Sequence, residues 1–138
     1  MKKWIGTPKS IKDYIGFVYI ITHKPTGKYY IGKKLFWFKK TLKPLKGKKR
    51  KRRSLVESDW KTYTGSSNKL NEFIEGHNKN DFERKIIRLC ETRFELSYYE
   101  MKEQIDSEAL FDPKCFNELI RVRLHRRKNN EILEEERN

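Results

Sequence analysis

Residues 16–32 read GFVYIITHKPTGKYYIG, and this stretch decides the fold. Residues 16–22 and 28–32 are rich in the β-branched and aromatic side chains that strands favour. Between them, residues 24–27 place proline at the second position and glycine at the fourth position of a type I turn followed by a bulge. The sequence therefore predicts an antiparallel β-hairpin.

The segments that follow the hairpin predict two helices and one further strand. Residues 67–75 place apolar side chains on one helical face and are followed by Gly76, which is typical of a helix end. Residues 82–90 have the composition of a strand, and residues 97–107 have the pattern of a second helix. This order predicts an α+β domain with a small, mainly antiparallel three-stranded sheet flanked by helices.

The length of 138 residues fits one domain. We expect an N-terminal lead-in at residues 1–15 and the folded domain at residues 16–120. Within it, Pro44, Gly47 and many lysines predict a mobile basic loop at residues 39–56. Residues 121–138 are expected to form a charged tail or helix.

The net charge of +14 is concentrated in one part of the chain. No Asp or Glu occurs from Tyr14 to Val56, a span that holds fourteen of the thirty-three Lys and Arg residues. Such a block attracts a polyanion and releases its counterions on contact, which favours nucleic acid as the partner. It lacks the apolar face of a membrane-surface helix, and no segment is long and apolar enough to span a bilayer, so we expect no membrane partner and a cytoplasmic protein.

The ionisable residues restrict which catalytic sites are possible. There is no HExxH motif and no cluster of acids at ligand spacing, and Cys90 and Cys115 lack the spacing of a metal site. A hydrolytic site that used a metal would have to hold it with one or two carboxylates and water. This is how Mg²⁺ is usually bound in proteins.

Two short motifs in the hairpin resemble those of a known family. Phe17-Val18-Tyr19 is followed, ten residues later, by Tyr30-Ile31-Gly32. Residues 16–120 thereby resemble the GIY-YIG nucleases, although Phe and Val stand where that family has Gly and Ile. The resemblance implies a small stand-alone endonuclease of phage or mobile-element type, acting in the cytoplasm of a bacterial cell or phage host. It also implies Mg²⁺ or Mn²⁺ as the cofactor and double-stranded DNA as the substrate.

The resemblance also implies roles for individual residues. Tyr19 and Tyr30 match the family's two tyrosines. In that family one of them acts as general base toward water, and the other positions water or phosphate. Glu100 matches the single metal-binding glutamate, and Asn117 matches an asparagine that follows the helix. A free tyrosine has a pKa near 10, so a tyrosine base needs help from neighbouring cations.

The resemblance further implies an arginine on a helix after the second motif, in contact with the scissile phosphate. That position falls near Lys40, and the first arginine after the motif is Arg50. Among the nearby cations we favour Arg53, then Lys33, for this role. The remaining basic residues are expected to contact the DNA backbone: Lys34, Lys40, Lys48, Lys49, Arg50, Lys51 and Arg52.

Other interpretations of these residues remain open at this stage. Tyrosines in strands usually pack in the core, and Ser97 followed by Glu100 also fits a helix-capping box. The departures in the first motif and the displaced arginine favour a second hypothesis, a catalytically inactive basic protein that binds DNA or RNA. The sequence does not indicate the oligomeric state.

Overall fold

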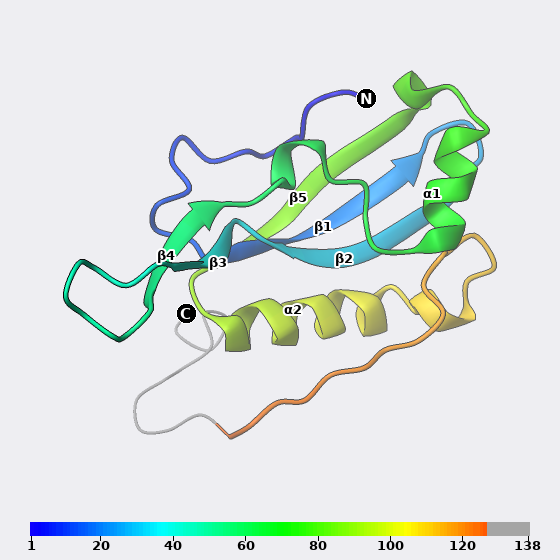
Figure 1. Cartoon of the computed structure of the whole chain (residues 1–138). Helices are drawn as coiled ribbons and strands as arrows, with labels where there is room; N and C mark the ends of the chain where they lie inside the picture. The colour runs from blue at the N-terminus through cyan, green and yellow to red at the C-terminus, as the bar shows by residue number, and fades with distance from the viewer. Residues whose placement is uncertain (127–138) are drawn as a thin grey trace.

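A three-stranded antiparallel sheet with strand order β2-β1-β5 forms the centre of this computed structural model, which describes residues 1–126 (Figure 1). The α+β architecture with two α-helices agrees with the sequence-based prediction. The strands are β1 (Gly16–His23), β2 (Tyr29–Leu35), β3 (Trp37–Leu42), β4 (Arg52–Glu57) and β5 (Phe82–Cys90). The helices are α1 (Asn68–Glu75) and α2 (Arg93–Asp106), with short 3₁₀ turns at Trp60–Thr62, Lys79–Asp81 and Ala109–Phe111.

The predicted hairpin is confirmed as β1 and β2, which pair from Gly16 with Leu35 to Thr22 with Tyr29. Its turn is one residue wider than expected, because the Gly27 amide donates to the His23 carbonyl at 2.8 Å. Gly27 has φ +75°, a left-handed conformation that glycine adopts without steric cost.

Alternation along β1 sends its side chains to two separate cores. Phe17, Tyr19 and Ile21 lie on one face of the sheet, whereas Val18 and Ile20 lie on the other. The lead-in and α1 contribute to the first core, and α2 covers the second (Figure 1). The covering side chains are Trp4, Trp60, Leu70 and Ile74 in the first core, and Leu96 and Tyr99 in the second.

Helix α2 begins earlier than the sequence suggested. Thr92 is its N-cap and accepts a hydrogen bond from the Glu95 amide at 3.1 Å, while the Glu95 carboxylate accepts from the Glu91 amide at 3.1 Å. This reciprocal pair is the capping box. Ser97 and Glu100 therefore lie within the helix, so the capping role considered for Glu100 is wrong and its carboxylate is available for another function.

The basic loop predicted at residues 39–56 is limited to residues 43–51, because residues 39–42 and 52–56 belong to the antiparallel strands β3 and β4. The many lysines obscured the strand-forming residues Phe38, Thr41 and Val56. The base of this hairpin is fixed to the domain, since the Trp37 indole donates to the Tyr14 carbonyl at 3.0 Å.

Residues 1–15 are part of the packed domain, whereas residues 121–126 are not in regular secondary structure. Residues 1–15 pack against the domain as expected, with Ile5 bridged to Lys85 on β5. Residues 121–126 form neither helix nor strand, and the rest of the charged tail predicted at 121–138 lies outside the described residues. Within the described part of the chain, no helix has the length and apolarity needed to cross a membrane.

Burial of His23 predicts a pH-dependent loss of stability. Its ring packs on Phe73 and Phe82, and burial, followed by the neighbouring His77, lowers its pKa below 6.5. Because the unfolded chain takes up the proton first, the stability this ring contributes above about pH 6.5 is lost as pH falls through the lowered pKa. We expect the melting temperature of wild type to drop more between pH 7.5 and 5.5 than that of His23→Gln. Equal drops in thermal scans would show that His23 does not cause the effect.

Candidate active site

Tyr19 is the most deeply buried of the predicted site residues, with 1% of its surface exposed. It lies on the central strand directly opposite Gly32 of β2, and its phenol ring crosses over that glycine. A Cβ atom at Gly32 would overlap the Tyr19 hydroxyl and lie only 2.7 Å from its Cζ atom. The glycine of the second motif is therefore needed to admit the tyrosine of the first.

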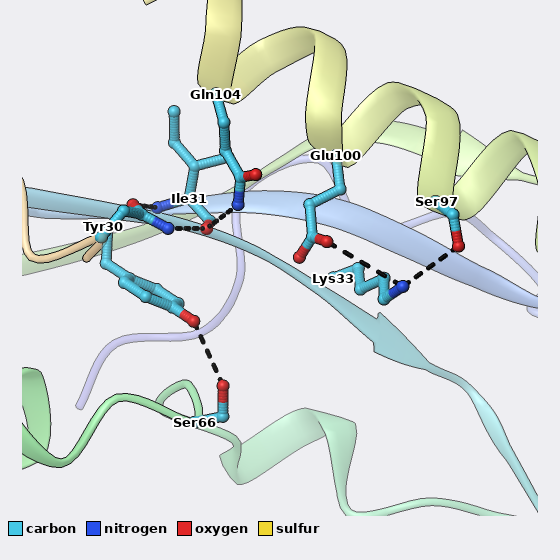
Figure 2. Close-up of polar contacts among 8 residues, drawn as sticks. Tyr30, Ile31, Lys33, Ser66, Ser97, Glu100 and Gln104 are labelled. Atoms are coloured by element: carbon cyan, nitrogen blue, oxygen red, sulfur yellow. Dashed lines mark hydrogen bonds and ion pairs between the residues drawn. The ribbon is translucent and has the colours of Figure 1, made fainter. Parts of the chain in front are cut away.

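Tyr30 lies on the same face of the sheet as Tyr19, nearer to solvent. The two ring centroids are 6.2 Å apart. The Tyr30 hydroxyl is 3.1 Å from the Ser66 hydroxyl, which belongs to the loop before α1 (Figure 2). Ser66 was not anticipated, because 36 residues separate it from Tyr30 in the sequence.

Glu100 extends from α2 toward β2, where Lys33 lies beside it (Figure 2). The Lys33 ammonium is 3.9 Å from the Glu100 carboxylate and donates to the Ser97 hydroxyl at 3.1 Å. Burial raises the pKa of Glu100, and the adjacent Lys33 partly opposes this rise. A bound cation would favour the charged carboxylate for the same electrostatic reason.

The tyrosines and Glu100 meet around an edge strand and not across a groove between two walls. Tyr19 and Tyr30 are on the α1 face of the sheet, whereas Glu100 reaches β2 from α2 on the other face (Figure 2). Only β2 lies between them, and it is the edge strand of the three-stranded sheet. Burial is the main cause of the raised pKa of both tyrosines, and the Glu100 charge adds to the rise in each case.

Both tyrosines are neutral in the protein at physiological pH. Burial, then the nearby Tyr63, raises the pKa of Tyr19 far above its usual value. Burial also raises the pKa of Tyr30, but its hydrogen bond with Ser66 acts in the opposite direction. Tyr30 is therefore the easier of the two to deprotonate.

Asn117 holds the edge strand in place. Its side-chain amide donates to the Ile31 carbonyl at 2.8 Å and accepts from the Ile31 amide at 2.9 Å. Gln104 from α2 donates to the same carbonyl at 3.1 Å (Figure 2). Because both ends of its amide are occupied, Asn117 positions Ile31 between Tyr30 and Gly32, and the structure gives it no direct contact with the site's carboxylate or phenols.

The structure separates the two favoured phosphate-binding cations. Lys33 lies in the site next to Glu100, whereas Arg53 lies on β4, opposite Thr41, in the hairpin that projects from the domain (Figure 1). Lys34, which was expected to contact DNA, has two partners within the protein. Its ammonium is 2.7 Å from the Asp59 carboxylate and 4.1 Å from the centroid of the Tyr63 ring.

The inserted hairpin also displaces the helix on which the resemblance places a cation. The first α-helix after the second motif is α1, and Lys69 is its only basic residue. Lys69 lines a groove of about 500 Å³ together with Tyr30, Ser66 and Asn117, and it pairs with Glu118 at 2.7 Å. Sequence spacing missed Lys69 because the extra strands β3 and β4 lengthen the connection.

The other predicted DNA-binding residues are exposed on the projecting hairpin, away from the tyrosines and Glu100 (Figure 1). They belong to β3, to β4 or to the connection between these strands. These residues are Lys40, Lys48, Lys49, Arg50, Lys51 and Arg52.

The donor atoms of the site fit a sparsely coordinated divalent cation. Among residues 1–126, no group of three or more His, Cys, Asp or Glu side chains is placed to hold a metal. Glu100 supplies one partly buried carboxylate, with 19% of its side chain exposed. Mg²⁺ usually takes one or two carboxylates, keeps several waters and binds substrate phosphate. A single, partly exposed carboxylate such as that of Glu100 satisfies these requirements.

The fold and site therefore define a small α+β domain with paired tyrosines on a hairpin and one acidic residue on a later helix. Residues 2–120 match the family model described as "Putative endonuclease segE, GIY-YIG domain". The chain belongs to the GIY-YIG family, a family of endonucleases, which act on nucleic acid. No curated protein and no solved structure matches the chain significantly.

Proposed function

We propose that the protein is a metal-dependent DNA endonuclease that hydrolyses phosphodiester bonds at the edge of β2. The observation that carries this proposal is the packing of Tyr19 and Tyr30 against Gly32 of β2, while Glu100 reaches the same strand from α2 beside Lys33. The basic segment on the adjoining hairpin provides the attraction for a polyanionic substrate.

Glu100 would hold Mg²⁺ or Mn²⁺ by its carboxylate. When bound, such an ion supplies charge that stabilises the leaving oxygen and acidifies water. Tyr30 is the better candidate for the base toward the attacking water, because it is nearer to solvent and Ser66 opposes the rise in its pKa. It would act as the phenolate, after losing its own proton to solvent, and the positive charge of Lys33 and of a bound cation would favour that form. Tyr19 would remain protonated and donate a hydrogen bond to water or to a phosphate oxygen.

Two lysines are placed to bind phosphate oxygens near these groups. Lys33 lies against Glu100 and carries its charge at the edge of β2. Lys69 lies in the first turn of α1 and lines the groove beside Tyr30. Each would act as a point charge, without the bidentate fork of arginine.

The proposal is tested by incubating supercoiled plasmid with the protein, in Mg²⁺ and in excess chelator. We expect nicking only with Mg²⁺, and a rate about 10²- to 10⁴-fold lower for Tyr30→Phe, the range typical of a lost proton-transfer group. Tyr29→Phe is the matched control, since its hydroxyl bonds Asp112 and its side chain packs with the other core. Nicking in chelator, or an unimpaired Tyr30→Phe, would contradict the proposal.

A second candidate function, an inactive binding protein, was favoured by the departures in the first motif. The structure shows where these residues lie: Phe17 packs on Trp4, Phe36 and Trp60 in one core, and Val18 lies in the other. Both side chains are fully buried and take part in packing. Binding of plasmid without any metal-dependent nicking would select this candidate.

A further inference from the structure

The β3–β4 hairpin is a separate two-stranded sheet that leaves the domain where β2 ends (Figure 1). We call residues 37–57 the basic ribbon. From Lys39 to Arg53 it carries ten Lys and Arg residues, all exposed, and no acidic residue. The two strands give fixed positions to four of these side chains, Lys39, Lys40, Arg52 and Arg53, and the other six lie in the connection between the strands.

The strand register divides the strands of the basic ribbon into two faces, each with two basic side chains. On one face, Lys40 lies opposite Ser54, and Arg52 lies opposite Leu42. Side chains alternate along each strand, so Lys39 and Arg53 fall on the other face. Each face therefore presents one lysine from β3 and one arginine from β4.

The face with Lys40 is the one that continues toward the tyrosines. Phe38 shares this face, and its ring centroid is 4.8 Å from the Lys34 ammonium. The same ammonium lies 4.1 Å from the centroid of Tyr63, whose ring packs on Tyr19 with a centroid distance of 6.1 Å. A continuous row of contacts thus joins the Lys40 face to the active site.

The opposite face is turned toward the body of the domain at its base. Trp37 belongs to that face and donates its indole N–H to the Tyr14 carbonyl. Leu55, on the same face, lines a hollow with Tyr14 and Glu91. DNA bound at the tyrosines would therefore meet Lys40 and Arg52 before it met Lys39 and Arg53.

The dimensions of a two-stranded ribbon select its partner. The major groove of B-DNA, about 12 Å wide, admits a β-ribbon directly, whereas the minor groove, at about 6 Å, takes one only when the duplex is bent or unstacked. The major groove of duplex RNA is too narrow and deep for side chains to read. From Tyr30 to Leu42 the chain can extend at most about 40 Å, at roughly 3.3 Å per residue, which is about one turn of B-DNA.

We propose that the basic ribbon lies in the major groove of duplex DNA, within about one turn of the bond that is cut, with Lys40, Ser54 and Arg52 toward the base edges. Arginine and lysine pair there with guanine O6 and N7. The inference rests on the proposed function for the nature of the substrate. It does not depend on cutting, so binding and cleavage test the two separately.

Double alanine variants on the two faces of the basic ribbon remove the same number of charges, and comparing them tests the proposed orientation. Binding of the full chain to a fluorescent 30-base-pair duplex is measured by anisotropy in EDTA, so that cleavage cannot interfere. We expect Lys40→Ala/Arg52→Ala to weaken binding at least about tenfold, and Lys39→Ala/Arg53→Ala at most about threefold. Equal losses would overturn the orientation, because plain electrostatic attraction does not distinguish the faces. No loss in either variant would overturn the role of the ribbon.

Competition experiments on the wild-type protein–DNA complex test which groove the basic ribbon occupies and whether the protein prefers DNA to RNA. Methyl green, a major-groove ligand, should displace the protein, whereas netropsin, a minor-groove ligand, should not. Duplex RNA of the same length should compete about tenfold less well than DNA. The reverse drug pattern, or equal competition by RNA, would overturn the proposal. Normal ribbon-dependent binding without plasmid nicking would instead refute only the proposed nuclease activity.

Discussion

Glu100→Gln is expected to abolish plasmid nicking while leaving DNA affinity intact. The amide keeps the size of the side chain but lacks the charge that would hold a divalent cation. Loss of one charge-stabilising group typically costs about 10²- to 10³-fold in rate, and loss of the carboxylate proposed to hold the ion should cost at least about that much. The measurement is the initial rate of nicking in Mg²⁺, with salt-dependent binding measured in parallel.

Glu103→Gln is the matched control for this prediction. It makes the same chemical change about one turn further along α2, where the structure shows no approach to the tyrosines. We expect its nicking rate to stay within about twofold of wild type. If both variants nick DNA like wild type, the assignment of Glu100 is wrong. If Glu100→Gln loses binding as well, its role is structural.

Gly32→Ala is the second change expected to have a large effect. The added methyl group would overlap the Tyr19 hydroxyl and lie 2.9 Å from Cε1 of Tyr30. Both phenols must move, so nicking should fall about 100-fold or more, as occurs when positioned groups are displaced by about 1 Å. Overpacking should also lower the free energy of unfolding by about 1–3 kcal/mol.

Gly76→Ala separates this local effect from a general intolerance of alanine. Gly76 ends α1 with φ −83°, and an added Cβ would come no closer than 3.8 Å to any neighbouring atom. This variant should keep both its activity and its melting temperature. Wild-type nicking by Gly32→Ala would show that the close approach of Tyr19 to Gly32 is not needed for cleavage.

The sequence predicted those elements whose signals are local. The hairpin at residues 16–32 combines strand-forming residues with a proline and glycine turn, and α1 has a serine cap at Ser67 and a glycine end. The start of α2 was misplaced because Thr92 and Glu95, which form its true capping box, lie before the segment chosen as helix. A second plausible box at Ser97 competed with the true one.

The motifs directed attention to Tyr19, Tyr30 and Glu100, and the roles that the resemblance implies for them stay predictions. Ser66 and Tyr63 are brought beside the tyrosines by long-range packing that no local pattern records. The phosphate-binding cation stays a prediction, because the β3–β4 insertion changes the spacing after the second motif. The three-dimensional position of α1 adds Lys69 to the candidates.

The proposed nuclease activity requires one divalent cation at the edge of β2. The most direct test is a crystal structure of Tyr30→Phe with duplex DNA and Mn²⁺, with the metal located by its anomalous scattering. We predict a single peak next to the Glu100 carboxylate, at the edge of β2. A peak elsewhere, or none beside Glu100 when DNA is bound, would contradict the proposed site.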